Sequence, residues 1–134
     1  MKPNRLTIPS DPKRLVQVDK FAEKITRRLK FSDDQRDDIA ISLSEAVNNA
    51  IIHGNRADPE KTVTIEILPI EEGLRIIVTD QGEGFNMQQV PDPTSPEHLL
   101  AESGRGLLII HHLMDRVEVK VTKKGTRVEM EKHY

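Results

Sequence analysis

An acidic residue followed by two spaced glycines comes directly after an apolar run near the middle of the chain. The run, residues 74–79, is typical of a buried strand, and Asp80, Gly82 and Gly84 follow it. A carboxylate fixed at a strand end can accept a hydrogen bond from an exocyclic amine. The glycines would let a ligand ring or phosphate approach the backbone closely. An ordinary turn after a strand would use the same residues. The motif alone therefore does not distinguish a ligand site from a turn, and the other motifs of the chain have to decide.

A carboxylate and a carboxamide are spaced four residues apart on a predicted helix. The sequence predicts this helix from Ser32 to about His53, with Gly54 stopping it and a loop following at 55–59. Because successive residues turn by about 100°, Glu45 and Asn49 fall together on a flank of the helix. The apolar face beside them consists of Ile39, Leu43, Ala46, Val47 and Ala50. An amide oxygen is a hard ligand suited to Mg²⁺, and a carboxylate can act as a general base on a hydroxyl or water. A solvated helix flank is the alternative interpretation.

Two glycines flank an arginine where another helix is predicted to begin. Backbone N–H groups at a helix start point outward at the positive end of the dipole, so Gly104, Arg105 and Gly106 could cradle a phosphate. A flexible hinge is the alternative for this segment. Thr126, after Gly125, could point a hydroxyl at a ligand ring or could simply be a strand residue.

Hydrophobic periodicity predicts the elements that position these residues. Strands are expected at 5–8, 62–68, 74–79, 117–121 and around Val128 and Met130, and helices at about 12–29, 32–53 and 104–114. Glycine-containing turns at 71–73 and 124–125 imply hairpins. The order predicts an α+β fold, a two-layer sandwich with helices on one face of a mixed, mostly antiparallel sheet. The proline-containing stretch at about 86–103 is too long for an idle connection and is expected to be a lid.

The composition limits what this chain can be. Its 134 residues suffice for one domain with a sizeable core, expected to span 1–134. A net charge of -2 without a basic stripe, and only 3% aromatic residues, argue against direct nucleic acid binding. Cysteine is absent, and no apolar run approaches the length of a signal peptide or membrane span. We therefore expect a cytoplasmic protein without membrane association.

The order of the four motifs resembles that of the histidine-kinase-like (GHKL) ATPase superfamily, which includes gyrase, heat-shock chaperones, histidine kinases and mismatch-repair proteins. The superfamily's asparagine box is resembled by segment 45–49, and its two glycine boxes by segments 80–84 and 104–106. Its terminal threonine is resembled by segment 125–126. Within the superfamily the chain is most similar to bacterial anti-sigma-factor serine/threonine kinases, through SEAVNNAIIHG at 44–54 and ESGRGL at 102–107. The resemblance spans nearly the whole chain and implies the same α+β fold.

The resemblance implies ATP and Mg²⁺ as cofactors and a role for each matched residue. Asn49 would hold the Mg²⁺ that bridges the phosphates, since its four-residue step from Glu45 favours it over Asn48. Glu45 would take the proton from a substrate serine or threonine. Asp80 would accept a hydrogen bond from the adenine amine, with Thr126 supporting the same site. The other nucleotide-binding residues would be Gly82, Gly84, Gly104, Arg105, Gly106 and Leu107.

The same resemblance implies a protein serine/threonine kinase that regulates transcription as an anti-sigma factor. It would bind a sigma factor and phosphorylate an anti-anti-sigma antagonist of the STAS type, and a homodimer is expected. Two alternatives remain: a nucleotide-gated binding module with little catalysis, and a histidine-kinase catalytic domain working alone. The histidine-kinase alternative ranks lower, because the 44 residues before Glu45 are too few for a dimerisation domain that carries the phospho-accepting histidine.

Overall fold

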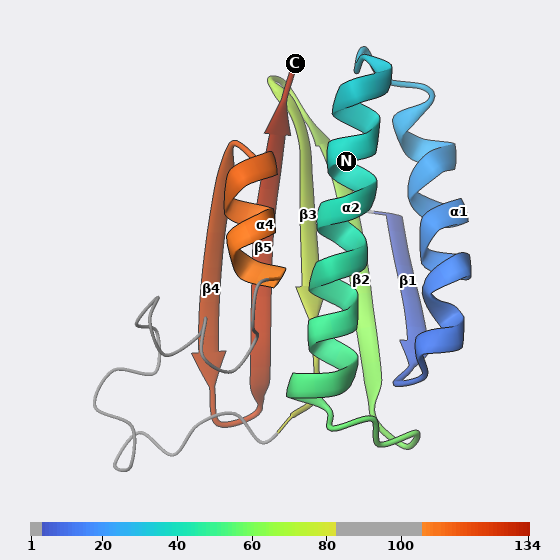
Figure 1. Cartoon of the computed structure of the whole chain (residues 1–134), viewed down its shortest axis with the longest axis vertical. Helices are drawn as coiled ribbons and strands as arrows, with labels where there is room; N and C mark the ends of the chain where they lie inside the picture. The colour runs from blue at the N-terminus through green and yellow to red at the C-terminus, as the bar shows by residue number, and fades with distance from the viewer. Residues whose placement is uncertain (1–3, 83–105) are drawn as a thin grey trace.

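The fold is one antiparallel sheet with its helices packed on one face (Figure 1). The computed structural model describes residues 4–82 and 106–134. Within them the strands follow the spatial order β1-β2-β3-β5-β4. Their bounds are β1 Asn4–Pro9, β2 Thr62–Ile70, β3 Gly73–Thr79, β4 Arg116–Thr122 and β5 Gly125–His133. The predicted α+β class, with helices on one face, is confirmed.

Every pairing between the described strands is antiparallel. The hairpins β2–β3 and β4–β5 impose this direction, and β1 and β5 then run antiparallel to β2 and β3. The parallel pair that a mixed sheet would contain is not found among these strands, so the sheet is simpler than predicted. Because β3 lies beside β5, the end of β3 meets the start of β5, and this is where Asp80 and Thr126 come together.

The helical layer consists of α1 Leu15–Thr26, α2 Asp33–Asn49 and α4 Gly106–Leu113, with a 3₁₀ turn at Pro12–Arg14 and a π-helical turn at Ala50–Gly54. In Figure 1, α2 lies between α1 and α4. None of the helices in the described part of the chain is both long enough and apolar enough to cross a membrane.

Helix α2 begins where the sequence predicts. Ser32 Oγ accepts from the Gln35 backbone N–H at 3.1 Å, and Gln35 Oε1 accepts from the Ser32 N–H at 3.0 Å, forming a capping box. The regular α-helix ends at Asn49, and the π-helical turn continues it to Gly54, the residue predicted to stop it. Such wide turns inside helices often occur at functional sites, and this one begins directly after Asn49.

Helix α1 is shorter than predicted. Its apolar spacing extends to Leu29, but the helix ends at Thr26, and the Leu29 N–H donates to the Thr26 carbonyl at 3.1 Å in the turn that follows. Leu29 nevertheless packs against the core. The apolar spacing continued into the turn, so it did not mark the helix end.

The core lies between the helices and the inner face of the sheet. Alternate residues of β2 and β3 point into it, as a period of two predicts. Helix α4 adds Leu107 and Ile110. The largest fully buried side chains are Ile8, Ile39, Leu43, Ile51, Ile65, Ile67, Leu74, Ile76, Ile110 and Met130. This packing fixes the ends of α2, β3 and β5 relative to one another.

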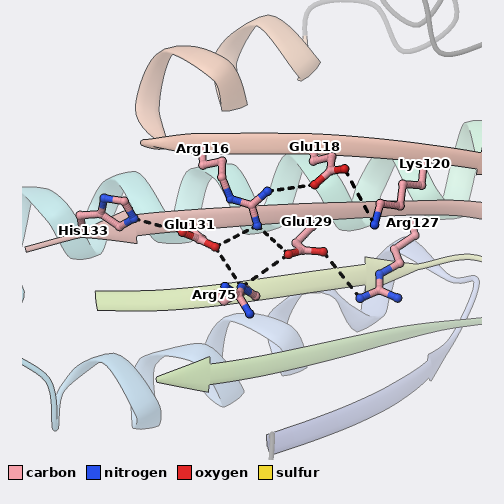
Figure 2. Close-up of polar contacts among 8 residues, drawn as sticks. All are labelled: Arg75, Arg116, Glu118, Lys120, Arg127, Glu129, Glu131 and His133. Atoms are coloured by element: carbon pink, nitrogen blue, oxygen red, sulfur yellow. Dashed lines mark hydrogen bonds and ion pairs between the residues drawn. The ribbon is translucent and has the colours of Figure 1, made fainter. Parts of the chain in front are cut away.

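The outer face of the sheet carries a network of ion pairs (Figure 2). Glu131 Oε2 accepts from Arg75 Nε at 2.9 Å and from Arg116 Nη2 at 2.8 Å, across β3, β5 and β4. Arg116 Nη2 also donates to Glu129 Oε1 at 2.6 Å. The Glu131 side chain is only 8% exposed although no described helix covers this face, because the arginines flank it on both neighbouring strands.

Stability at low pH should depend on Glu131. Hydrogen bonds, first from Arg116 and then from His133 and Arg75, lower the pKa of Glu131 from 4.5 to about 2. The ionised form therefore contributes its full stability above about pH 4.5 and loses it as the pH falls toward about 2. We expect Glu131→Gln to lower the free energy of unfolding at neutral pH by about 2–3 kcal/mol and to flatten its decrease in acid, measured by urea unfolding across pH.

The matched control is Glu71→Gln, in the exposed turn between β2 and β3. Its free energy of unfolding should stay within about 0.5 kcal/mol of wild type at every pH. If wild type and Glu131→Gln lost stability in parallel on acidification, the network would not be the source of the acid sensitivity.

Candidate functional site

Asp80 is a buried carboxylate that, among the described residues, is hydrogen-bonded by backbone groups only. It follows β3 directly and is 6% exposed. Its Oδ1 accepts from the Thr126 N–H at 2.9 Å and from the Gly82 N–H at 3.0 Å, and its own N–H donates to the Thr126 carbonyl at 3.0 Å. No described residue donates to Oδ2. The carboxylate is thus fixed in one orientation with an acceptor oxygen to spare, which suits a ligand that donates a hydrogen bond.

Three glycines surround this carboxylate. A methyl group added at Gly54 would overlap Asp80 Oδ2, one at Gly82 would overlap the Gly54 carbonyl, and one at Gly125 would overlap the Asp80 carbonyl. Gly125 also has a φ of +146°, which side-chain-bearing residues rarely adopt. The end of α2, the segment after β3 and the β4–β5 turn therefore converge on one acid, in a space that any Cβ would fill.

The sequence analysis predicts Gly54 only as the end of a helix. It does not predict that Gly54 lies against the Asp80 carboxylate. A glycine after a helix is a common C-terminal cap, and no local pattern indicates a second constraint at this position. Gly54 and Asp80 are brought together only by the pairing of β2 with β3 and the packing of α2.

Burial raises the pKa of Asp80 above its ordinary value of 3.8, while the N–H groups of Thr126 and Gly82 and the charge of Lys61 oppose the rise. The ionised carboxylate is therefore less favourable here than in water. A donor bound at Oδ2 would relieve part of that cost, so the free site favours binding of a hydrogen-bond donor.

Asn55 anchors the segment that follows Asp80. It is 1% exposed, and its Nδ2 donates to Ser10 Oγ at 2.7 Å and to the Thr62 carbonyl at 2.9 Å. Its Oδ1 accepts from the Gln81 N–H at 2.7 Å. The side chain thus ties the end of β1, the start of β2 and the residue after Asp80 to the turn behind α2. The sequence predicted residues 55–59 as a loop and did not identify this role.

Replacing Asn55 should destabilise the protein. We expect Asn55→Ala to lower the free energy of unfolding by about 2–3 kcal/mol, because the Gln81 N–H, the Thr62 carbonyl and the Ser10 hydroxyl all lose their hydrogen bonds to a fully buried side chain. Urea unfolding measures the change. The exposed Gln17→Ala on α1 is the control and should stay within about 0.5 kcal/mol of wild type. An equal, small effect of both substitutions would show that Asn55 is not an anchor.

Glu45 and Asn49 lie on the last two turns of α2, and both side chains are partly exposed. Asn49 Nδ2 is buried and has no hydrogen-bond partner among the described residues. An i, i+4 pair on a helix brings the two side chains within about 6 Å of each other. Because Gly54 on the same helical segment touches Asp80, the pair and the buried acid occupy the same end of the helical layer.

The remaining predicted site residues are only partly described. Gly84, Gly104, Arg105 and the predicted lid at about 86–103 lie outside the described residues. Gly106 begins α4. The Leu107 side chain is 5% exposed and belongs to the core, so a ligand contact from this residue would have to use its backbone N–H.

The residues fit Mg²⁺ only in partnership with phosphate. The described residues hold no group of three or more His, Cys, Asp or Glu side chains that could bind a metal ion by themselves. Mg²⁺ in nucleotide sites commonly takes one or two protein oxygens and completes its shell with phosphate oxygens and water. The buried Nδ2 of Asn49, which lacks a described partner, is a donor that suits a phosphate oxygen, and the Oδ1 of the same amide is the hard oxygen that would hold the ion.

The chain belongs to the histidine kinase-like ATPase domain family, which it matches over residues 8–132. It is 38% identical to a serine-protein kinase RsbW of Bacillus licheniformis over 114 residues, 81% of this chain and 71% of the relative. It is 37% identical to an anti-sigma F factor of Clostridium perfringens over 123 residues, covering 88% of this chain and 79% of the relative. The serine-protein kinase RsbW of Bacillus subtilis is 31% identical over 134 residues, which cover 96% of this chain and 83% of the relative.

Solved structures agree on the fold. The RsbU and RsbW domains of a Mycobacterium tuberculosis protein superpose with a TM-score of 0.72 and 17% identity over 99% of this chain. This chain spans 33% of that solved chain. The histidine kinase domain of a blue-light activated histidine kinase from Erythrobacter litoralis gives a TM-score of 0.60 with 19% identity, covering 92% of this chain and 60% of that one.

Proposed function

We propose that this chain is an ATP-dependent protein serine/threonine kinase that acts as an anti-sigma factor in the cytoplasm. The observation that carries the proposal is the Asp80 carboxylate, which is buried among glycines, with two donors at Oδ1 and no described donor at Oδ2. Relatives named serine-protein kinase and anti-sigma F factor, each sharing more than a third of aligned residues, support this function over the two alternatives.

Asp80 would recognise the adenine base. Its Oδ2 would accept the hydrogen bond from the adenine exocyclic amine, and Thr126, fixed beside it through the backbone, would support the same contact. Gly82 and Gly84 would let the nucleotide lie against the backbone. The start of α4, with Gly104, Arg105, Gly106 and the Leu107 N–H, would contact the phosphates beneath a lid at about 86–103.

Asn49 would hold Mg²⁺ through its amide oxygen together with the phosphates. When bound, the ion would neutralise charge that develops on the transferring phosphoryl group. The protein's part is to supply one oxygen at the end of α2, at the junction with the wider π-helical turn.

Glu45 would act as the general base. A substrate serine Oγ forms a bond to the γ-phosphorus while the bond from that phosphorus to the bridging oxygen of ADP breaks, and the hydroxyl proton passes to the Glu45 carboxylate. Phosphoserine and ADP leave, and Glu45 then releases the proton to water. One turn of helix separates this base from Asn49, so the same element positions the proton acceptor and the proposed metal ligand.

The partners would be a sigma factor and a STAS-type anti-anti-sigma antagonist. Phosphorylation would add nearly two negative charges to the antagonist, enough to disrupt an interface that buries the modified residue. A homodimer is also proposed. Strand β1 lies at one edge of the sheet and offers backbone groups for such a contact.

Incubation with labelled ATP, Mg²⁺ and the STAS-type protein encoded nearest to this chain in its genome tests the proposal. We expect label on a serine or threonine of that protein, and loss of transfer when Mg²⁺ is chelated. Binding of ATP without transfer would instead support a nucleotide-gated binding module. Acid-labile label on a histidine would support a histidine-kinase domain.

A further inference from the structure

Exposed apolar side chains lie on both sides of Glu45 on α2. Ile41 is 47% exposed and Ile52 is 40% exposed, whereas the adjacent Ile51 is fully buried. Large apolar side chains this exposed are few in the described residues: Val16, Ile41, Ile52, Leu108 and Tyr134. Ile41 lies on α2 one turn before Glu45, and Ile52 lies about two turns after it in the π-helical turn. At about 100° per residue, Ile41 falls on the side of α2 opposite its buried face, and the exposure of Ile52 puts it at the surface as well.

The geometry of phosphoryl transfer puts the substrate on this surface. To lose its proton to Glu45, a serine hydroxyl must come within about 3 Å of the carboxylate. Ile41 and Ile52 lie about 6 Å and about 10 Å from Glu45 along the helix axis. Residues next to the target serine, spaced about 3.5 Å apart in an extended chain, therefore reach both isoleucines.

An acidic side chain lies nearer the N-terminal end of α2, at the edge of the groove between α1 and α2. Asp37 lies one turn before Ile41, is exposed, and forms no ion pair with another described residue. The neighbouring acids are engaged differently: Asp33 pairs with Arg36, and Asp38 pairs with Lys132 at 3.1 Å. A partner lying along α2 would meet a negative charge about 12 Å before the catalytic base.

We propose that Ile41 and Ile52 form the docking surface for the protein substrate, on either side of the base. This inference rests on the proposed kinase function and specifies the chemistry of the substrate. The substrate presents its target serine between two apolar side chains and carries a basic side chain that lies against Asp37.

Steady-state phosphorylation of the nearest encoded STAS-type protein tests this surface. We expect Ile41→Ser and Ile52→Ser each to raise the KM for that protein roughly fivefold to tenfold, with kcat and the KM for ATP unchanged. Serine and isoleucine have similar helix propensities, and both sites are exposed, so the thermal midpoint should stay near that of wild type. Asp37→Asn should raise the same KM roughly threefold and reduce its dependence on salt.

Val16→Ser is the matched apolar control, on α1 and 62% exposed. Glu71→Gln is the matched charge control. Neither should change the KM for the protein substrate. An unchanged KM for Ile41→Ser and Ile52→Ser with an active wild type would overturn the docking surface alone. Weaker capture of the sigma factor by these variants, at unchanged KM, would assign the surface to that partner and also overturn the proposal. If the wild-type protein transferred no phosphoryl group to the STAS-type protein, the proposed kinase function would be wrong, and the docking surface would be wrong as well.

Discussion

Asp80→Asn should lower the affinity for ATP and ADP by roughly 30-fold to 1,000-fold without unfolding the protein. An asparagine at this position can still present its oxygen to the N–H groups of Gly82 and Thr126, which hold the side chain in place. Its amide nitrogen would then stand where Oδ2 stands. A donor would face the donor of the adenine amine, so the accepted hydrogen bond is lost and both groups are left without a partner.

The same substitution should leave the free protein as stable as wild type, or more stable. Burial raises the pKa of Asp80, so the ionised carboxylate at neutral pH costs free energy in the folded state. That cost is absent in acid, where the group is protonated in both states, and it grows as the pH rises through the ordinary value and then the folded value. A neutral asparagine avoids it at every pH.

Isothermal titration with ATP and Mg²⁺, together with urea unfolding at neutral pH, measures both effects. Asp19→Asn is the control, because the pKa of this exposed acid is also raised, by desolvation at the groove between α1 and α2 and by the charge of Glu23. It should gain stability slightly and keep full affinity. Wild-type affinity in Asp80→Asn would rule out the assigned contact with adenine.

Glu45→Gln should lower kcat for phosphoryl transfer by about 10²- to 10⁴-fold while ATP binds as in wild type. The amide has the same shape as the carboxylate but cannot accept the hydroxyl proton. Glu45→Ala should show the same loss, because the function removed is proton acceptance and not packing of a side chain that is partly exposed.

Single-turnover transfer to the antagonist and calorimetric affinity for ATP separate chemistry from binding. Glu66→Gln, on the outer face of β2, is the control and should retain full transfer. If Glu45→Gln and Asp80→Asn lost ATP affinity to the same extent, the division of roles between base and adenine contact would be wrong. Retained transfer in both Glu45 variants would make another group the base.

The elements that position the site could be predicted because each has a strong local pattern. The capping residues Ser32 and Gln35 mark the start of α2, and the alternation in β2 and β3 marks their buried faces. Asp80 could be placed at a strand end because the apolar run before it ends there. The end of α1 could not be predicted, because Leu29 continues the apolar spacing although it lies in the turn after the helix.

The contacts that complete the site could not be predicted because they join distant segments. Gly54 and Asn55 become site residues only when the end of α2 is set against the segment after β3. The pairing of Glu131 with Arg75 and Arg116 depends on the strand register, which the charges alone do not specify. The burial of Leu107 likewise requires knowing which face of α4 meets the core.

The backbone-only support of Asp80 limits how base selectivity can change. Both donors to Oδ1 are main-chain N–H groups, and three glycines approach the carboxylate. Among the described residues, no side chain donates to this carboxylate, so none of them could tune the proposed adenine contact gradually. Within this part of the chain, discrimination between adenine and guanine, whose ring carries a carbonyl in place of the amine, would then rest on residue 80, and a guanine-preferring form would replace this acid.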